Sequence, residues 1–246
     1  MRAEQIYEYI NTIAPFSAQE DWDNSGFQVG ERTKEVQKIL FSLDATADLV
    51  REAVESECDL IVTHHPFLFH PQKQFLAESP AFQAAKHNIA VISAHTSYDC
   101  AAGGVNDILA ETVGLSDIRT SDCGLFRIGT VPVQSAKDFA KAVKSALQAQ
   151  VSVSLPEKSI QSVAVCGGAG ADFIADAKAQ GADLFLTGEA KHHEILDAAA
   201  LGISVVCAGH FETELPAVRA LCARVQAQFP QIECILSKQT SPIFSI

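Results

Sequence analysis

Residues 59–66 read DLIVTHHP, a short apolar run that ends in two histidines and a proline. The run of leucine, isoleucine and valine is typical of a buried strand. In open α/β sheets, ligands bind beyond the carboxyl ends of such strands. The segment therefore predicts a strand that delivers His64 and His65 to the edge of a sheet.

The flanking sequence repeats the same unit. Residues 38–43 (KILFSL) and 90–94 (AVISA) are further apolar runs, and residues 47–57 between them have helical periodicity. Strands are also expected at 125–133, 151–155, 160–166, 183–187, 203–208 and 232–236, and helices at 136–148, 171–180, 190–200 and 210–229. This alternation predicts an α/β fold with mixed or parallel sheets flanked by helices.

The composition restricts the class of protein. The 246 residues carry 30 acidic and 18 basic side chains, a net charge of −12, which disfavours binding to bulk nucleic acid or to an anionic membrane. No apolar run is long enough for a membrane span, and the N-terminus lacks the apolar core of a secretory signal. The seven cysteines are scattered and form no C-x-x-C pair. We therefore expect a cytoplasmic protein without disulfides.

The histidines show where chemistry is expected. His64 and His65, His95, and His210 each follow an apolar run, so their strand ends are predicted to meet at one crevice. A single histidine at a strand end is more often a polar cap. The combination of a histidine doublet with further histidines and acids favours a metal site instead.

The spacing of these residues indicates two ions. Adjacent residues leaving a strand point in opposite directions, so His64 and His65 are expected to bind different ions. His210 and Glu214 are four residues apart at a helix start and share one face, and Asp99 lies four residues after His95. The predicted ligands are His64, His65, Asp99, His210 and Glu214. Five ligands do not fill two tetrahedral shells without bridging groups, which leaves the exchangeable positions of a catalytic site.

Other polar residues have plainer interpretations. The CGGAG stretch at residues 166–170 lacks both G-x-G-x-x-G and G-K-[ST], so we interpret it as a tight strand-to-helix turn. Glu189, His192 and His193 form either a solvated helix start or a group that contacts substrate or transfers protons. Asp23, Asn24 and Asp44 are typical turn residues with a minor supporting role at most. Cys100 is interpreted as a packing residue.

Six segments occur together in a characteristic order. They are DNSGFQVG (23–30), SLDAT (42–46), THHPFLF (63–69), HTSYDCAAGGVND (95–107), LTGEAKHHEIL (186–196) and GHFETE (209–214). Together they resemble the GTP cyclohydrolase 1 type 2 homolog family, also called NIF-three-like dinuclear-metal-centre proteins. The resemblance covers nearly the whole chain, and THHP, H-T-x-x-D-x-A-x-G-G and GH-x-x-T-E are specific in combination.

The family resemblance has implications for the metal ligands, the assembly and the domains. It makes the same five residues the ligands of two metal ions, with Glu214 as a bridge and His95 as a close neighbour. It also implies a two-lobed chain that assembles into a toroidal homo-hexamer with its metal sites facing an internal cavity. The ligand positions then predict a metal-binding domain of residues 1–127 plus 205–246, with residues 128–204 as an inserted lobe.

The predicted function is a metal-dependent hydrolase acting on a small nucleotide-like substrate through a metal-bound hydroxide. If the family name describes the reaction, C8 of the guanine ring of GTP is attacked, and His95 or His193 moves protons. Two divalent ions per chain are expected, and imidazole and carboxylate ligands suit Zn, Fe, Mn, Co or Ni. Two alternatives stay open: a two-metal phosphoesterase, and a non-catalytic metal-binding scaffold or regulatory protein.

Overall fold

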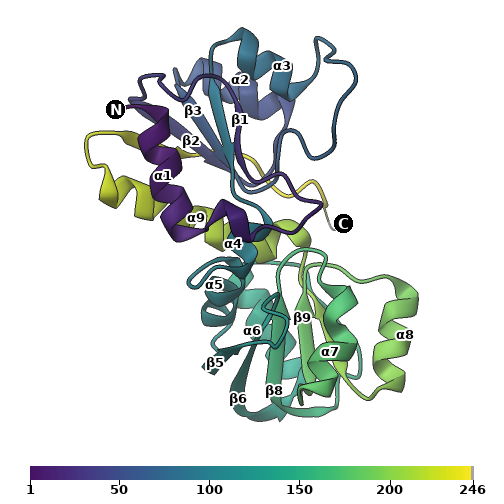
Figure 1. Ribbon diagram of the computed structural model, residues 1–246. Coiled ribbons are helices and arrows are strands. Elements are labelled where there is room, and N and C mark those ends of the chain that lie inside the picture. The colour runs from purple at the N-terminus through teal and green to yellow at the C-terminus, as the bar shows by residue number, and fades with distance from the viewer. Residues whose placement is uncertain (245–246) are drawn as a thin grey trace. The chain divides into compact units, whose positions relative to one another are not determined.

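The computed structural model describes residues 1–244, and the chain divides into two compact units (Figure 1). The first unit contains Met1–Ala102 and Val218–Thr240. The second contains Gly103–Ala217 together with residues 241–244. Each unit has its own sheet with helices on both faces. Within residues 1–244, no helix is long and apolar enough to cross a membrane.

The first unit is built on a five-stranded sheet with the order β1-β4-β3-β2-β11. Its strands are β1 (Gly26–Val29), β2 (Lys38–Ser42), β3 (Leu60–Thr63), β4 (Ala90–Ser93) and β11 (Glu233–Leu236). Its helices are α1 (Ala3–Ile13), η1 (Phe16–Ala18), α2 (Ala47–Glu55), α3 (Pro80–Lys86), α4 (Thr96–Cys100) and the C-terminal part of α9 (His210–Gln228). All neighbouring strands are parallel except β1 and β4.

Alternating strand residues give this sheet two apolar faces. Leu40, Ile61 and Val91 pack against α2 and α3, where Val50 and Ala84 are buried. Figure 1 shows α1 and α9 side by side on the sheet, apart from α2 and α3. The two helices are joined by the ring of Tyr9, whose hydroxyl donates to the Arg224 carbonyl at 3.4 Å and whose ring meets Phe229 edge-on. The sheet is therefore the middle of three layers.

The second unit is built on a six-stranded sheet with the order β5-β6-β8-β9-β10-β7. Its strands are β5 (Ser116–Thr120), β6 (Arg127–Ser135), β7 (Ser152–Val153), β8 (Ser159–Cys166), β9 (Leu184–Thr187) and β10 (Ser204–Cys207). Its helices are α5 (Val105–Thr112), α6 (Ala136–Leu147), η2 (Ala171–Phe173), α7 (Ile174–Ala179), α8 (His192–Ala200) and the start of α9. Strands β8, β9 and β10 run parallel, and the other pairs are antiparallel.

This sheet also buries both faces. Val163 and Leu184 pack in one core with Phe139 of α6. On the opposite face, Phe185 packs with Ile174 of α7 in a second core. The alternation of inward residues along each strand is the reason that two separate cores exist.

The predicted α/β fold with mixed, helix-flanked sheets is confirmed, but several short elements, among them β1, β5 and α4, were not predicted. Strand β1 begins at a glycine within a polar stretch, and β5 is an exposed edge strand whose sequence SDIRT has no apolar alternation. Helix α4 has only five residues. None of these segments carries the apolar periodicity by which strands and helices are predicted.

The compact units also differ from the predicted domains, over residues 103–127 and 205–217. Helix α5 belongs to the second unit because Leu109 and Val113 are buried in the same core as Phe139. Strand β10 belongs there because Val205 and its neighbours pair in register with β9. The start of α9, which follows β10 directly, is in the second unit for the same reason.

Candidate metal centre

Three histidines gather at one edge of the first sheet. His64 and His65 follow β3, and His95 follows β4, its parallel neighbour in register. The centroid of the His64 ring lies 5.0 Å from the His65 ring centroid and 5.2 Å from the His95 ring centroid. The His65 and His95 ring centroids are 5.5 Å apart. Each ring offers a nitrogen within 4.8 Å of the other two, so the three form a group able to hold a metal ion.

His64 and His65 were expected to point in opposite directions, but both offer a nitrogen to this group. That they bind different ions stays a prediction. The alternation of side chains applies to extended backbone. Strand β3 ends at Thr63, and the chain bends at both histidines. The Thr63 hydroxyl donates to the His65 carbonyl at 2.7 Å across this bend.

Each of the three rings is oriented through its Nδ1 atom. Nδ1 of His64 lies 2.8 Å from the Ala94 carbonyl oxygen. Nδ1 of His65 lies 2.7 Å from Oδ1 of Asp44, and Nδ1 of His95 lies 2.8 Å from Oδ1 of Asp23. Because carbonyl and carboxylate oxygens accept hydrogen bonds, Nδ1 carries the proton and the lone pair of the neutral ring is on Nε2. This is the tautomer of a metal-ligating histidine whose second nitrogen is held by an oxygen.

Asp23 is the most constrained of the orienting groups. Its side chain is fully buried and also accepts hydrogen bonds from the Ser25 hydroxyl at 2.8 Å and from the Thr96 hydroxyl at 2.6 Å. Burial by itself would raise the pKa of Asp23. The hydrogen bonds from His95, Thr96 and Ser25 outweigh burial and hold this pKa well below its ordinary value. Asp23 is therefore a carboxylate that fixes both His95 and the start of α4.

Asp99 is the acidic member of the first unit's cluster. It lies in α4, four residues after His95, and one turn of helix turns its side chain back toward the histidines. Its Oδ1 atom is 3.5 Å from Nε2 of His64. Two of the predicted ligands, His64 and Asp99, therefore lie close together within this unit.

A second pair of metal-ligating side chains lies in the second unit. His210 and Glu214 occupy the first two turns of α9, and Nε2 of His210 is 3.2 Å from Oε2 of Glu214. Nδ1 of His210 is 3.0 Å from Oε1 of Glu189, so this ring is oriented in the same way as the other three. The Glu214 side chain is only 6 % exposed.

The glycine-rich turn after β8 packs directly against this pair. Gly168 has φ +60°, and a Cβ atom placed on it would overlap Oε1 of Glu214 and lie 2.9 Å from Nε2 of His210. The amides of Gly167, Gly168 and Gly170 donate to side-chain oxygens. These N–H groups are engaged within the protein, as in a tight turn and unlike a phosphate-binding loop.

The predicted ligands belong to two sets, one from each compact unit. His64, His65 and Asp99 lie together with His95 in the first unit, and His210 and Glu214 lie in the second. The strand before His210 is β10, which belongs to the second sheet, and sequence patterns alone do not assign it there. That the strand ends carrying the histidines meet at one crevice stays a prediction.

Sequence reasoning gave too little weight to three orienting carboxylates. Asp23, Asp44 and Glu189 each hold one histidine Nδ1, although they had been interpreted mainly as turn or solvated residues. A signal was present, since all three lie in segments that carry the resemblance. His193 lies exposed in the first turn of α8, and its role in proton transfer stays a prediction.

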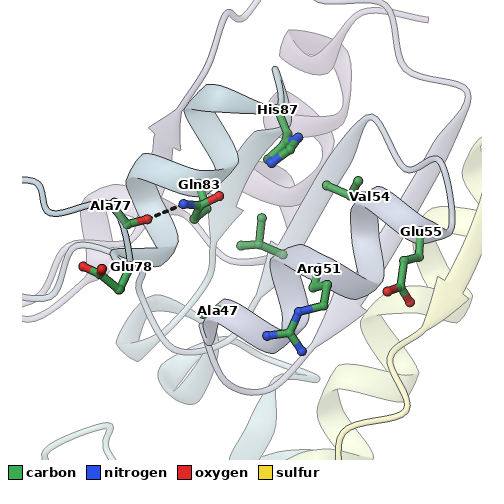
Figure 2. Close-up of a pocket in the computed structure, with 9 residues that line it drawn as sticks. Ala47, Arg51, Val54, Glu55, Ala77, Glu78, Gln83 and His87 are labelled. Carbon is green, nitrogen blue, oxygen red and sulfur yellow. Dashed lines mark hydrogen bonds between the residues drawn. The ribbon is translucent and has the colours of Figure 1, made fainter.

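A separate open groove of about 590 Å³ lies between α2 and α3. Figure 2 shows Val54 and Arg51 on one wall and Gln83 and His87 on the other, with the Gln83 side chain bonded to the Ala77 carbonyl. None of its lining residues belongs to the histidine cluster. The groove is therefore distinct from the candidate metal-binding residues.

The family model described as Duf34/NIF3 (NGG1p interacting factor 3) matches residues 1–242. The chain belongs to the Duf34/NIF3 family. A Clostridium perfringens protein named GTP cyclohydrolase 1 type 2 homolog is 32 % identical, with 99 % of each chain covered.

Solved structures with the same fold cover nearly the whole chain. A Staphylococcus aureus hypothetical protein is 26 % identical with a TM-score of 0.92, covering 100 % of this chain and 99 % of its own. Reduced HcgD from Methanocaldococcus jannaschii is 29 % identical with a TM-score of 0.86, covering 97 % and 98 %. The recognised family and the α/β fold are thereby confirmed.

Proposed function

We propose that this Duf34/NIF3 protein is a metal-dependent hydrolase with a dinuclear centre that acts on a nucleotide-like substrate. One observation carries the proposal: His64, His65, His95 and His210 each have Nδ1 held by an oxygen. Histidines that serve only as polar caps have no common reason to bond through Nδ1 and leave Nε2 as the nitrogen with the lone pair. Metal-ligating histidines have such a reason, because the hydrogen bond at Nδ1 fixes the tautomer and the orientation of the ring.

The proposed ligands are His64, His65, Asp99, His210 and Glu214, with Glu214 as the bridging carboxylate. The donor set fits divalent ions, since it combines neutral imidazoles and carboxylates without thiolates, and Zn, Fe, Mn, Co and Ni all accept it. The cradle around Glu214 also fits a ligand role, because Gly168 leaves its carboxylate the space that any side chain would fill. We propose that the two sets serve one centre.

When bound, such ions supply Lewis acidity and lower the pKa of water. The chain's own residues then have defined tasks. Asp44, Asp23 and Glu189 hold the rings of His65, His95 and His210. His95, fixed by Asp23, is the proposed proton carrier of the first unit, and exposed His193 is its proposed counterpart in the second.

Metal content tests the shared centre. Protein purified without added metal is analysed by elemental analysis, beside the variants His65→Ala and Glu214→Gln, and near two ions per chain are expected in the wild type. If one centre uses ligands from both units, each variant loses more metal than the ion held by the substituted residue's own unit. Independent loss, in which each variant leaves the other set fully loaded, contradicts the shared centre. Circular dichroism confirms that both variants remain folded.

Turnover tests the reaction. Metal-loaded protein is incubated with GTP, and ring-opened product and formate are measured against the double variant His65→Ala, Glu214→Ala. A rate no higher than that of the double variant contradicts the proposal. Phosphate release from a panel of phosphomonoesters and diesters, without formate, identifies a phosphoesterase instead. Stable metal retention without turnover on either panel favours the scaffold.

The assembly is a separate proposal. The family resemblance favours a homo-hexameric ring, which predicts a sedimentation mass about six times the 26.3 kDa of the chain. Analytical ultracentrifugation of the untreated protein measures it. A monomer or dimer at micromolar concentration contradicts the ring.

A further inference from the structure

Two aromatic side chains stand exposed beside His95. Trp22 is 57 % exposed and Phe69 is 37 % exposed. Their ring centroids lie 5.7 Å apart, and each lies 5.9 Å from the His95 ring centroid. Large aromatic rings that remain exposed next to a polar cluster commonly mark a ligand-binding surface.

The segments that carry the two rings are fastened to each other. The Asn24 side chain donates to the Leu68 carbonyl at 2.6 Å, and the Leu68 amide donates to Gln28 at 3.1 Å. Between Trp22 and Asn24, buried Asp23 is held by Ser25, His95 and Thr96. Trp22 and Phe69 therefore lie on a backbone that is ordered before any ligand arrives, which lowers the entropic cost of binding.

The geometry of the rings restricts the mode of binding. A planar ligand inserted between two rings needs their centroids about 7 Å apart, two carbon contact distances. Trp22 and Phe69 are closer than this and tilted by 53°. A ligand ring therefore stacks on an open face of the pair, with His95 edge-on to Trp22 and Phe69 tilted against it.

We propose that Trp22 and Phe69 form a stacking platform for a neutral nucleobase of the purine type, adjacent to His95. This inference rests on the proposed function and deepens it, because it names the part of the substrate that lies beside the histidines. Stacking on an aromatic face suits any planar heteroaromatic ring. A ring placed there favours ring opening over phosphoester cleavage as the reaction of this site.

The charges around the platform select the base rather than the phosphates. Residues 19–25 and 64–70 contain three carboxylates, Glu20, Asp21 and Asp23, and no lysine or arginine. Asp21, next to Trp22, is exposed. An anionic surface repels a triphosphate but accepts the N–H donors at the edge of a base.

Trp22 is the only tryptophan in the chain, so its fluorescence reports on the platform directly. The full-length protein is titrated with guanosine, first after removal of metal by chelation and then after metal loading. Saturable quenching by guanosine is expected in both states, and inorganic triphosphate added to the metal-free protein leaves the emission unchanged. Absence of saturable quenching by guanosine in both states overturns the platform.

Two phenylalanines of the same segment give a matched pair of variants. Phe69→Ala is expected to weaken guanosine binding about five- to 150-fold, the range of base–aromatic stacking losses. Phe75→Ala removes a phenylalanine that is 52 % exposed but outside the cluster, and leaves the affinity unchanged. Equal affinities of the two variants overturn the assignment of Phe69. Trp22→Phe, measured by calorimetry, retains most of the binding because it keeps an aromatic face.

Acrylamide quenching separates a small ligand from a second protein copy as the occupant. Efficient quenching of Trp22 in the untreated assembly supports the proposal, whereas a tryptophan already shielded in the absence of guanosine overturns it. The outcomes are also distinguishable from failure of the proposed function. Guanosine binding without GTP turnover supports the stacking platform and contradicts the proposed hydrolase reaction. GTP turnover that is unaffected by Phe69→Ala supports the reaction and contradicts the platform.

Discussion

Substitution of Gly168 by alanine is expected to disturb the His210–Glu214 pair specifically. A Cβ atom at this position overlaps Oε1 of Glu214 and lies 2.9 Å from Nε2 of His210. The overlapped atoms are the ends of side chains, so the carboxylate moves aside while the backbone stays in place. Glu214 is nearly buried and has little room, so its displacement breaks the 3.2 Å approach to His210.

The magnitude separates into two contributions. Gly168 has φ +60°, and a left-handed conformation costs a residue with a Cβ about 1–2 kcal/mol of folding free energy. The displacement of Glu214 acts mainly on metal binding, where disturbance of the groups around a ligand typically costs about ten- to 100-fold in affinity. Gly202→Ala is the matched control, because Gly202 has φ +70° in the same unit but nothing within 4 Å of its Cβ position.

Urea unfolding of the metal-free proteins and chelator competition for one divalent ion measure the two quantities. Both variants are expected to lose similar unfolding free energy, and only Gly168→Ala is expected to lose metal affinity. Equal metal affinities of Gly168→Ala and Gly202→Ala would refute the ligand role of the His210–Glu214 pair. A much larger loss of stability in Gly168→Ala would show instead that the backbone moves.

Three further changes are predicted to have separate effects. Asp23→Asn keeps the volume but replaces a buried acceptor by an amide, and is expected to cost about 3 kcal/mol of unfolding free energy in urea melts. Arg127→Met leaves Asp107 without its buried partner and is expected to cost about 3–5 kcal/mol of unfolding free energy. The double variant with Asp107→Asn recovers part of this loss. Equal unfolding free energies of Arg127→Met and the wild type contradict the prediction. Burial raises the pKa of Cys58 to about 11, so iodoacetamide at about pH 8 is expected to label exposed Cys123 before Cys58. Mass spectrometry measures the two labelling rates. Equal rates contradict the burial of Cys58.

The candidate ligands were predictable because their signal is local. The THHP doublet, the four-residue spacing of His95 and Asp99, and the same spacing of His210 and Glu214 can be read within one turn of helix or one strand end. The structure confirms the last spacing as a close pair and places Asp99 against His64. The His64 and His65 rings lie 5.0 Å apart rather than on opposite sides of a strand, because β3 ends at Thr63, before the doublet. Their assignment to different ions stays a prediction.

The sequence by itself determined the alternation of strands and helices, the donor chemistry of the histidines and acids, and membership of the family. Tertiary structure decided which oxygen orients each ring, since the Asp23–His95 hydrogen bond joins residues 72 positions apart and the Asp44–His65 and Glu189–His210 contacts join residues 21 apart. It also decided that β10 belongs to the second sheet and that His210, at the start of α9, belongs to the second unit. The physical reason is that periodicity reports which face of an element is buried, whereas strand order and long-range hydrogen bonds depend on how the elements pack.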